Sequence, residues 1–129
     1  MRHRKKTVKT LTWWAQKWEI RVRNLLTSLV NNGQIKTTEK KARVLESQGN
    51  KFFSRLTSLL RKYDDENEVR REAIRIVKST IYTKDDWKKV VDELLPKYRE
   101  ENRTSGFIQC YKLGYRQWDW AEEVLVKLV

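Results

Sequence analysis

The sequence predicts an α+β fold, in which about four helices pack on a small antiparallel sheet with a C-terminal hairpin. Three observations support this prediction. Apolar residues recur at three- and four-residue spacing over most of residues 12–95. Residues 107–129 are rich in aromatic and β-branched side chains. Only one proline and four glycines interrupt the 129 residues, which favours long regular elements.

Residues 1–11 are dense in cations and lack a hydrophobic period, so they are expected to form an extended basic arm before a single domain over residues 12–129. The first helix is expected to begin near Thr12, with apolar residues at Leu11, Trp14, Trp18, Val22, Leu25 and Leu29. Gly33 and the two asparagines before it should end this helix, because both residue types tolerate left-handed backbone. Residues 34–37 then predict a short strand that leads into a helix cap at Thr37 or Thr38.

Three further helices are predicted by their apolar faces. The second has Ala42, Leu45, Phe52, Leu56, Leu59 and Leu60 on one side, the third has Val69, Ala73, Ile76, Val77 and Ile81, and the fourth has Trp87, Val90, Val91, Leu94 and Leu95. Gly49 lies on the apolar side of the second helix, where a kink or a close approach of another segment is expected. Residues 63–67 supply turn and capping residues, and Thr83 with Asp86 is similar to a capping box. Pro96 is expected to stop or bend the fourth helix.

The C-terminal region predicts a β-hairpin. Residues 102–106 form a loop signal, and residues 107–115 and 124–129 have strand composition on either side of a turn around Trp118 and Asp119.

The charge of the chain is unevenly placed. The formal net charge is +12; residues 1–62 hold 16 Lys and Arg against three acidic residues, and the rest hold 13 against 14. A basic half joined to a neutral half indicates one face directed at a polyanion. Nucleic acid is the first candidate for this polyanion and an anionic membrane is the second. The membrane is disfavoured because the chain has no long apolar run and no signal-peptide pattern. The single cysteine, Cys110, excludes an intrachain disulfide and a cysteine zinc site, and fits a reducing cytoplasm.

Four groups of residues are candidates for RNA contact. The arm has five cations suited to phosphate oxygens, although a solvated tail is the alternative. Arg23 and Asn24 could present a cation and an amide on the polar side of the first helix, unless that face is merely solvated. The third group lies at the start of the second predicted helix, where free backbone N–H groups favour an anion. The fourth group is the two cations that flank Gly114 in the predicted hairpin. The four groups are Arg2, Arg4, Lys5, Lys6 and Lys9; Arg23 and Asn24; Lys36, Thr37, Thr38, Lys40 and Lys41; and Lys112 and Arg116.

Six tryptophans are a high number for a chain of this length. Trp14 and Trp18 lie on the apolar stripe of the first helix, which favours packing in the core. Trp13, Trp118 and Trp120 are candidates for stacking on an unpaired base or for docking to another protein.

Enzymatic chemistry is not indicated. His3 is the only histidine and lies in the arm, whereas Cys110 lies in a predicted strand, so no cysteine–histidine pair is expected. The paired acids at residues 64–65, 85–86 and 92–93 could hold a metal for nuclease chemistry, but helix capping and solvation explain them more simply. We expect no metal, cofactor or small-molecule substrate.

Several short motifs occur in an order that is informative as a set. They are Met-Arg-His-Arg-Lys at Met1 to Lys5, Arg23-Asn24, Ser28-Leu29-Val30, Ile-Lys-Thr-Thr at Ile35 to Thr38, Lys41-Ala42, Glu93-Leu94 with Pro96, Gly114-Tyr115-Arg116 and Asp119. In this order and spacing the chain resembles the bacterial large-subunit ribosomal protein seventeen family along essentially its whole length. The resemblance implies a non-enzymatic, cytoplasmic component of the large ribosomal subunit. It also implies binding to large-subunit ribosomal RNA near the exit of the peptide tunnel, beside neighbouring ribosomal proteins, and it adds His3 to the candidate RNA contacts.

The chain departs from this family at two places. Tryptophans stand at residues 13, 14 and 18, where polar and basic residues are usual, and residues 118–123 replace the family's Gly-Asp and Ala-Pro-Met with Trp-Asp-Trp and Ala-Glu-Glu. These departures indicate a divergent or redesigned member.

Two other functions remain as alternatives: a free-standing DNA- or RNA-binding regulator, and a small metal-dependent nuclease. A helix-turn-helix is not recognisable, because an extended segment follows the first helix.

Overall fold

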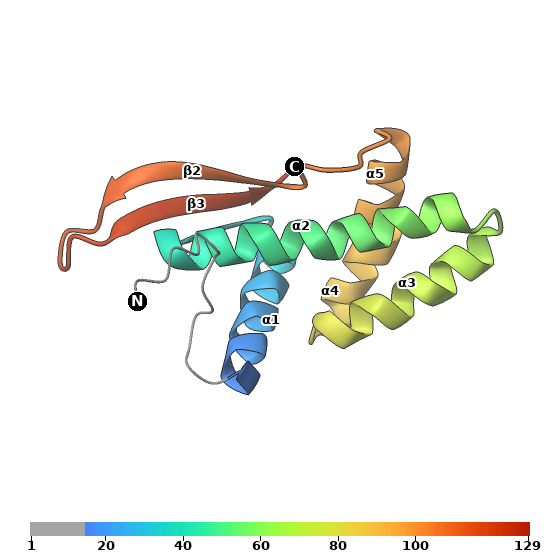
Figure 1. Cartoon of the computed structure of the whole chain (residues 1–129), viewed down its shortest axis with the longest axis horizontal. Helices are drawn as coiled ribbons and strands as arrows, with labels where there is room; N and C mark the ends of the chain where they lie inside the picture. Colours follow the sequence, from blue (N-terminus) through green and yellow to red (C-terminus); the bar gives the residue numbers. More distant parts are fainter. Residues whose placement is uncertain (1–14) are drawn as a thin grey trace, which may run out of the picture.

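The computed structural model describes the backbone of residues 15–129 and the side chains of residues 19–129 (Figure 1). The expected arm lies outside the described residues, as do the side chains of Trp13, Trp14 and Trp18.

The described elements follow one another in the predicted order (Figure 1). They are α1 (Ala15–Asn32), β1 (Gln34–Thr38), α2 (Glu39–Lys62), α3 (Glu66–Thr80), α4 (Lys84–Lys89), the π-helical turn η1 (Val90–Leu94), α5 (Leu95–Glu100), β2 (Ile108–Tyr115) and β3 (Glu122–Leu128). Because α4, η1 and α5 are continuous, they correspond to the single fourth helix that the sequence predicts. Four helices and a three-stranded sheet confirm the α+β class.

The sheet is antiparallel, with the strand order β1-β3-β2. The last of the three strands in the sequence therefore lies in the middle, and β1 pairs with it through Ile35 opposite Val126 and Thr37 opposite Val124. Val124 and Val126 are buried on the face that packs against α2. The register between β2 and β3 shifts between Lys112 and Gly114, which places a bulge at Leu113. The predicted hairpin is confirmed.

The helix ends follow local chemistry. Gly33 has a φ of +76°, and its N–H donates to the carbonyl of Leu29 at 2.8 Å, which ends α1 as predicted. Asp65 caps α3 by accepting from the backbone N–H of Asn67 at 3.0 Å. Thr38 occupies the cap position of α2, but its side chain makes no capping hydrogen bond.

The prediction for Pro96 is partly corrected. Helical backbone continues past this residue to Glu100, so the proline does not stop the helix. It lies at the start of α5, directly after the π-helical turn, in which the N–H of Leu95 donates to the carbonyl of Val90. Because a π-turn changes the hydrogen-bond spacing, the missing N–H of proline is accommodated where a regular α-helix would be broken.

The core has an aromatic centre beneath α2. Phe53 contacts Phe52, Tyr98 and Phe107 with ring centroids 5.1, 5.7 and 5.8 Å away. Phe53, Tyr98 and Phe107 are each at most 1% exposed. Burial raises the pKa of Tyr98 to about 12, with a smaller contribution from the nearby Glu101.

Gly49 is a point of close approach, as the sequence predicts. A Cβ at this position would overlap with Cδ1 of Ile108, and Cδ1 of Leu26 would be 3.5 Å away. The absence of a side chain therefore lets the start of β2 pack directly on α2.

Candidate nucleic-acid interface

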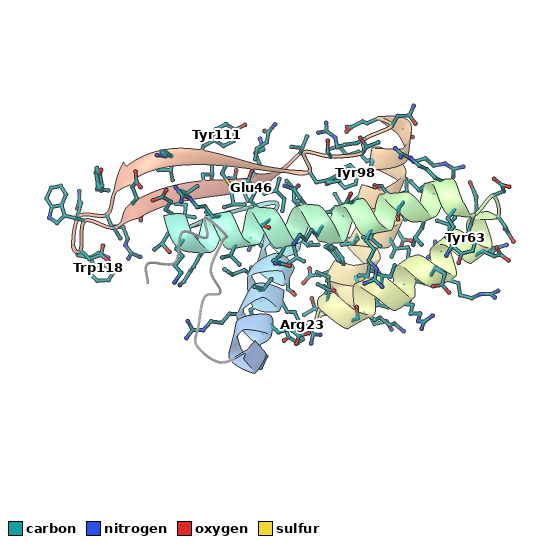
Figure 2. All side chains as sticks on the ribbon, viewed as in Figure 1. Arg23, Glu46, Tyr63, Tyr98, Tyr111 and Trp118 are labelled. Atoms are coloured by element: carbon teal, nitrogen blue, oxygen red, sulfur yellow. The ribbon has the colours of Figure 1, made fainter. Side chains whose placement is uncertain are left out.

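The hairpin extends past the beginning of α2 and carries Trp118 at its tip (Figures 1 and 2). Trp118 and Trp120 are 78% and 75% exposed, and Tyr115 is 64% exposed. The tip is therefore an aromatic surface, which is compatible with base stacking and with protein docking alike.

The turn at this tip is held by a network of hydrogen bonds. Arg116 makes two hydrogen bonds to the carboxylate of Asp119, one of them at 3.0 Å, and the N–H of Ala121 donates to the same carboxylate at 3.1 Å. The hydrogen bond from Arg116 holds the pKa of Asp119 below its usual value. The Arg116 guanidinium also lies 4.7 Å from the ring centroid of Trp118. Arg116, a predicted RNA contact, thus organises the turn.

Lys112, the other predicted contact in the hairpin, lies near an acidic pair. Its Nζ is 3.7 Å from a carboxylate oxygen of Glu122, and both residues are close to Glu39 in the first turn of α2. A hydrogen bond with Glu122, and then the positive charge of Arg43, hold the pKa of Glu39 below its usual value. The negative charge of Glu39 offsets part of the positive charge at the beginning of α2.

The predicted contacts on β1 and at the beginning of α2 point in different directions. Lys36, Lys40 and Lys41 are exposed. Thr37 faces the same side of the sheet as the buried Val124, and Thr38 is half-buried at the beginning of α2. The three lysines therefore present their charges at the surface, whereas the two threonines lie closer to the junction between the sheet and α2.

Arg23 and Asn24 do not form one presented pair. Asn24 is exposed, whereas Arg23 is half-buried. The Nε of Arg23 donates to the carbonyl of Thr80 at 3.2 Å, and its guanidinium lies 4.1 Å from the ring centroid of Tyr82. Figure 2 shows Arg23 on α1 beside the end of α3. Arg23 therefore links α1 to the segment after α3, a role that local sequence does not reveal.

The structure also shows a group of cations outside the predicted contacts. Lys51, Arg55 and Lys62 lie on the exposed side of α2, and no ion pair involves them in residues 19–129. Their spacing of four and seven residues places them on one helical face. The signal was present in the sequence, because residues 47–62 contain no acidic residue.

The acidic pairs lie at helix starts and on polar faces. Asp86 is buried and accepts a hydrogen bond from the hydroxyl of Thr83, whereas Asp85 is exposed. The predicted capping box is not formed, because the Thr83 side chain bonds the Asp86 side chain and makes no capping hydrogen bond to the backbone of α4. Among residues 19–129, no three His, Cys, Asp or Glu side chains gather as a metal site. The helices of the same region include none with the length and apolar character needed to cross a membrane.

Cys110 should react slowly with alkylating reagents. Burial, followed by the charge of Glu46, raises the pKa of its thiol from 9.0 to about 11. At pH 8 the thiolate population falls about a hundredfold, which the greater nucleophilicity of a more basic thiolate partly offsets, leaving a rate about tenfold below that of an ordinary thiol. Iodoacetamide labelling followed by mass spectrometry measures this rate. Labelling of the native chain at the speed of the urea-unfolded chain would contradict the prediction.

Comparisons with known proteins identify the family of this chain. Residues 21–129 match the family model described as Ribosomal protein L17. A large ribosomal subunit protein bL17 from Clostridium acetobutylicum is 34% identical over 108 residues, which cover 84% of each chain. The bL17 protein of Rubrobacter xylanophilus is 34% identical over 101 residues, covering 78% of this chain and 74% of that protein. The bL17 protein of Clostridium botulinum is 32% identical over 108 residues, covering 84% and 85%. The chain therefore belongs to the ribosomal protein L17 family, whose members are structural proteins of the large ribosomal subunit.

Proposed function

We propose that this chain binds large-subunit ribosomal RNA near the exit of the peptide tunnel and holds RNA segments together beside neighbouring ribosomal proteins. Family membership supports the ribosomal assignment. The proposed contacts are the arm residues Arg2, His3, Arg4, Lys5, Lys6 and Lys9, together with Arg23, Asn24, Lys36, Thr37, Thr38, Lys40, Lys41, Lys112 and Arg116. The proposed activity is binding alone, without catalysis, a cofactor or a small-molecule substrate.

One observation supports this proposal most directly, namely the uneven pairing of cations with carboxylates. Between residues 19 and 62, one of ten Lys and Arg side chains forms an ion pair, Arg43 with Glu39. Between residues 63 and 129, six of thirteen do. The basic half thus keeps its charge available for an external polyanion, and RNA phosphates are the polyanion that a ribosomal location supplies.

The salt dependence of RNA binding tests this function. The full chain should bind transcribed large-subunit RNA with an affinity that falls linearly with the logarithm of salt concentration. Glutamine at the five arm cations should reduce the magnitude of that slope by roughly 3.5 to 4.5, since each phosphate contact contributes about 0.7 to 0.9. Filter binding measures this slope in roughly 50 to 300 mM KCl, where counterion release dominates the salt dependence of RNA binding.

A matched variant separates specific contacts from net charge. Glutamine at Arg70, Arg71, Lys88, Lys97 and Arg99 removes the same formal charge from the neutral half and should change the slope much less.

Sedimentation of a tagged chain expressed in bacterial cells extends the test, because a chain that lacks the arm should no longer sediment with large ribosomal subunits. Salt-insensitive binding would refute the proposal, and base-specific binding to duplex DNA would favour a free-standing regulator.

A further inference from the structure

A row of cations on α2 lies between two surface hollows. We call Lys51, Arg55 and Lys62 the α2 cation row. The α2–loop hollow, of about 570 Å³, is lined by Asn50, Lys51, Ser54, Arg55, Ser105 and Gly106. The α2–α3 hollow, of about 460 Å³, is lined by residues of α2, the following turn and α3, among them Arg55, Lys62, Glu72 and Arg75. Arg55 thus lines both hollows.

The α2–loop hollow is lined by hydrogen-bond donors and has no carboxylate. Lys51 and Arg55 carry charge, and Ser54 and Ser105 carry hydroxyls. The amide oxygen of Asn50 already accepts from the N–H groups of Phe107 at 3.1 Å and Ile108 at 3.2 Å. Only the NH₂ group of that amide is left to interact with a ligand. Such a lining suits an anion with several acceptor oxygens, such as a phosphodiester.

The α2–α3 hollow has three cations and one acid. Arg75 lies 3.8 Å from Glu72, and both side chains are solvent-exposed enough for salt to screen their attraction. Lys62 lies 5.2 Å from the ring centroid of Tyr63, an interaction that leaves its charge available. The hydroxyls of Ser58 and Ser79 donate to carbonyls of their own helices. The lining therefore offers an anion a surplus of positive charge.

The row is unlike an ordinary solvated helix face. Solvated faces usually mix both signs, and opposite charges three or four residues apart stabilise the helix. Here like charges face solvent without an acid from residue 47 to residue 62, which costs stability when no ligand is bound. Lys51 and Lys62 are eleven residues apart, roughly 16 Å along the axis, so one phosphate cannot contact both.

We propose that α2 lies between two backbone segments of ribosomal RNA, one in each hollow, with Arg55 bridging them. This inference rests on the proposed function and adds a second RNA-binding surface, separate from the arm. The contacts involve phosphates, so they position the protein on folded RNA and carry no base specificity.

Single substitutions in the full chain test the two hollows separately. Lys51→Gln changes only the α2–loop hollow and Lys62→Gln only the α2–α3 hollow, whereas Arg55→Gln changes both. With transcribed large-subunit RNA as the probe, each lysine variant should reduce the magnitude of the salt slope by about 0.7 to 0.9, and the double variant by about twice that. Arg55→Gln should reduce it by at least as much as either lysine variant.

The matched control is Arg70→Gln with Arg99→Gln, which removes two cations that are paired with Asp92 and Glu66. It should leave the slope close to that of the parent chain. Equal thermal unfolding midpoints would confirm that all variants fold. A slope that changes in neither or in only one lysine variant overturns the inference. If that happens while the variant without arm cations still lowers the slope, the proposed function stands and only the inference about α2 fails. A parent chain that does not bind RNA refutes the proposed function and the inference together.

Discussion

Replacement of Phe53 by alanine should lower the free energy of unfolding by about 3 to 5 kcal/mol. Phe53 is 1% exposed and contacts three other aromatic rings that come from α2, α5 and the segment before β2. Deleting the ring would leave a cavity that three separate elements would have to close. Chemical denaturation monitored by circular dichroism measures the change.

Phe53→Leu is the matched control, because it keeps an apolar side chain of moderate volume at the same site. It should cost clearly less than Phe53→Ala. A loss below about 1 kcal/mol for the alanine variant would mean that the aromatic centre does not support the fold as described.

Gly49→Ala should destabilise the chain by up to about 2 kcal/mol, because overpacking costs about 1 to 3 kcal/mol and the better helix propensity of alanine returns about 1 kcal/mol. The added methyl group would overlap with Cδ1 of Ile108, which is 3% exposed and packed in the core. Overpacking should therefore outweigh the gain in helix propensity of about 1 kcal/mol. The free energy of unfolding in urea is the quantity to compare.

A second substitution tests the cause. Ile108→Val removes the Cδ1 atom itself and should cost about 0.5 to 1.5 kcal/mol alone. In that background Gly49→Ala should become neutral or stabilising, which a double-mutant cycle would report as a favourable coupling. Additive losses in the double variant would contradict the proposed overlap.

Much of the fold could be predicted because local chemistry determines it. Gly33 ends α1 through left-handed backbone, Asp65 caps α3, and the hairpin strands appear where aromatic and β-branched residues concentrate. The continuation of the helix past Pro96 could not be predicted. It depends on a π-helical turn whose hydrogen bonds no sequence period indicates.

The candidate site was less predictable, since long-range contacts decide which charges remain available. Arg23 looks like a surface cation from its neighbours in sequence, yet it contacts Thr80 and Tyr82, more than fifty residues away. Arg116 is similarly occupied by Asp119, although that partner is close in sequence. The α2 cation row could have been found from its spacing, but the hollows beside it depend on how α3 and the loop before β2 pack.

The central position of β3 has a consequence for synthesis of the chain. Neither β1 nor β2 pairs with the other, so both must wait for β3 before the sheet can form. About 84 residues separate the end of β1 at Thr38 from the beginning of β3 at Glu122, an interval of roughly 4 to 17 s at bacterial elongation rates. During that interval β1 has an unpaired edge, and the last cation of the basic half, Lys62, is made 24 residues into it. The nascent chain can therefore meet RNA before its own sheet is complete.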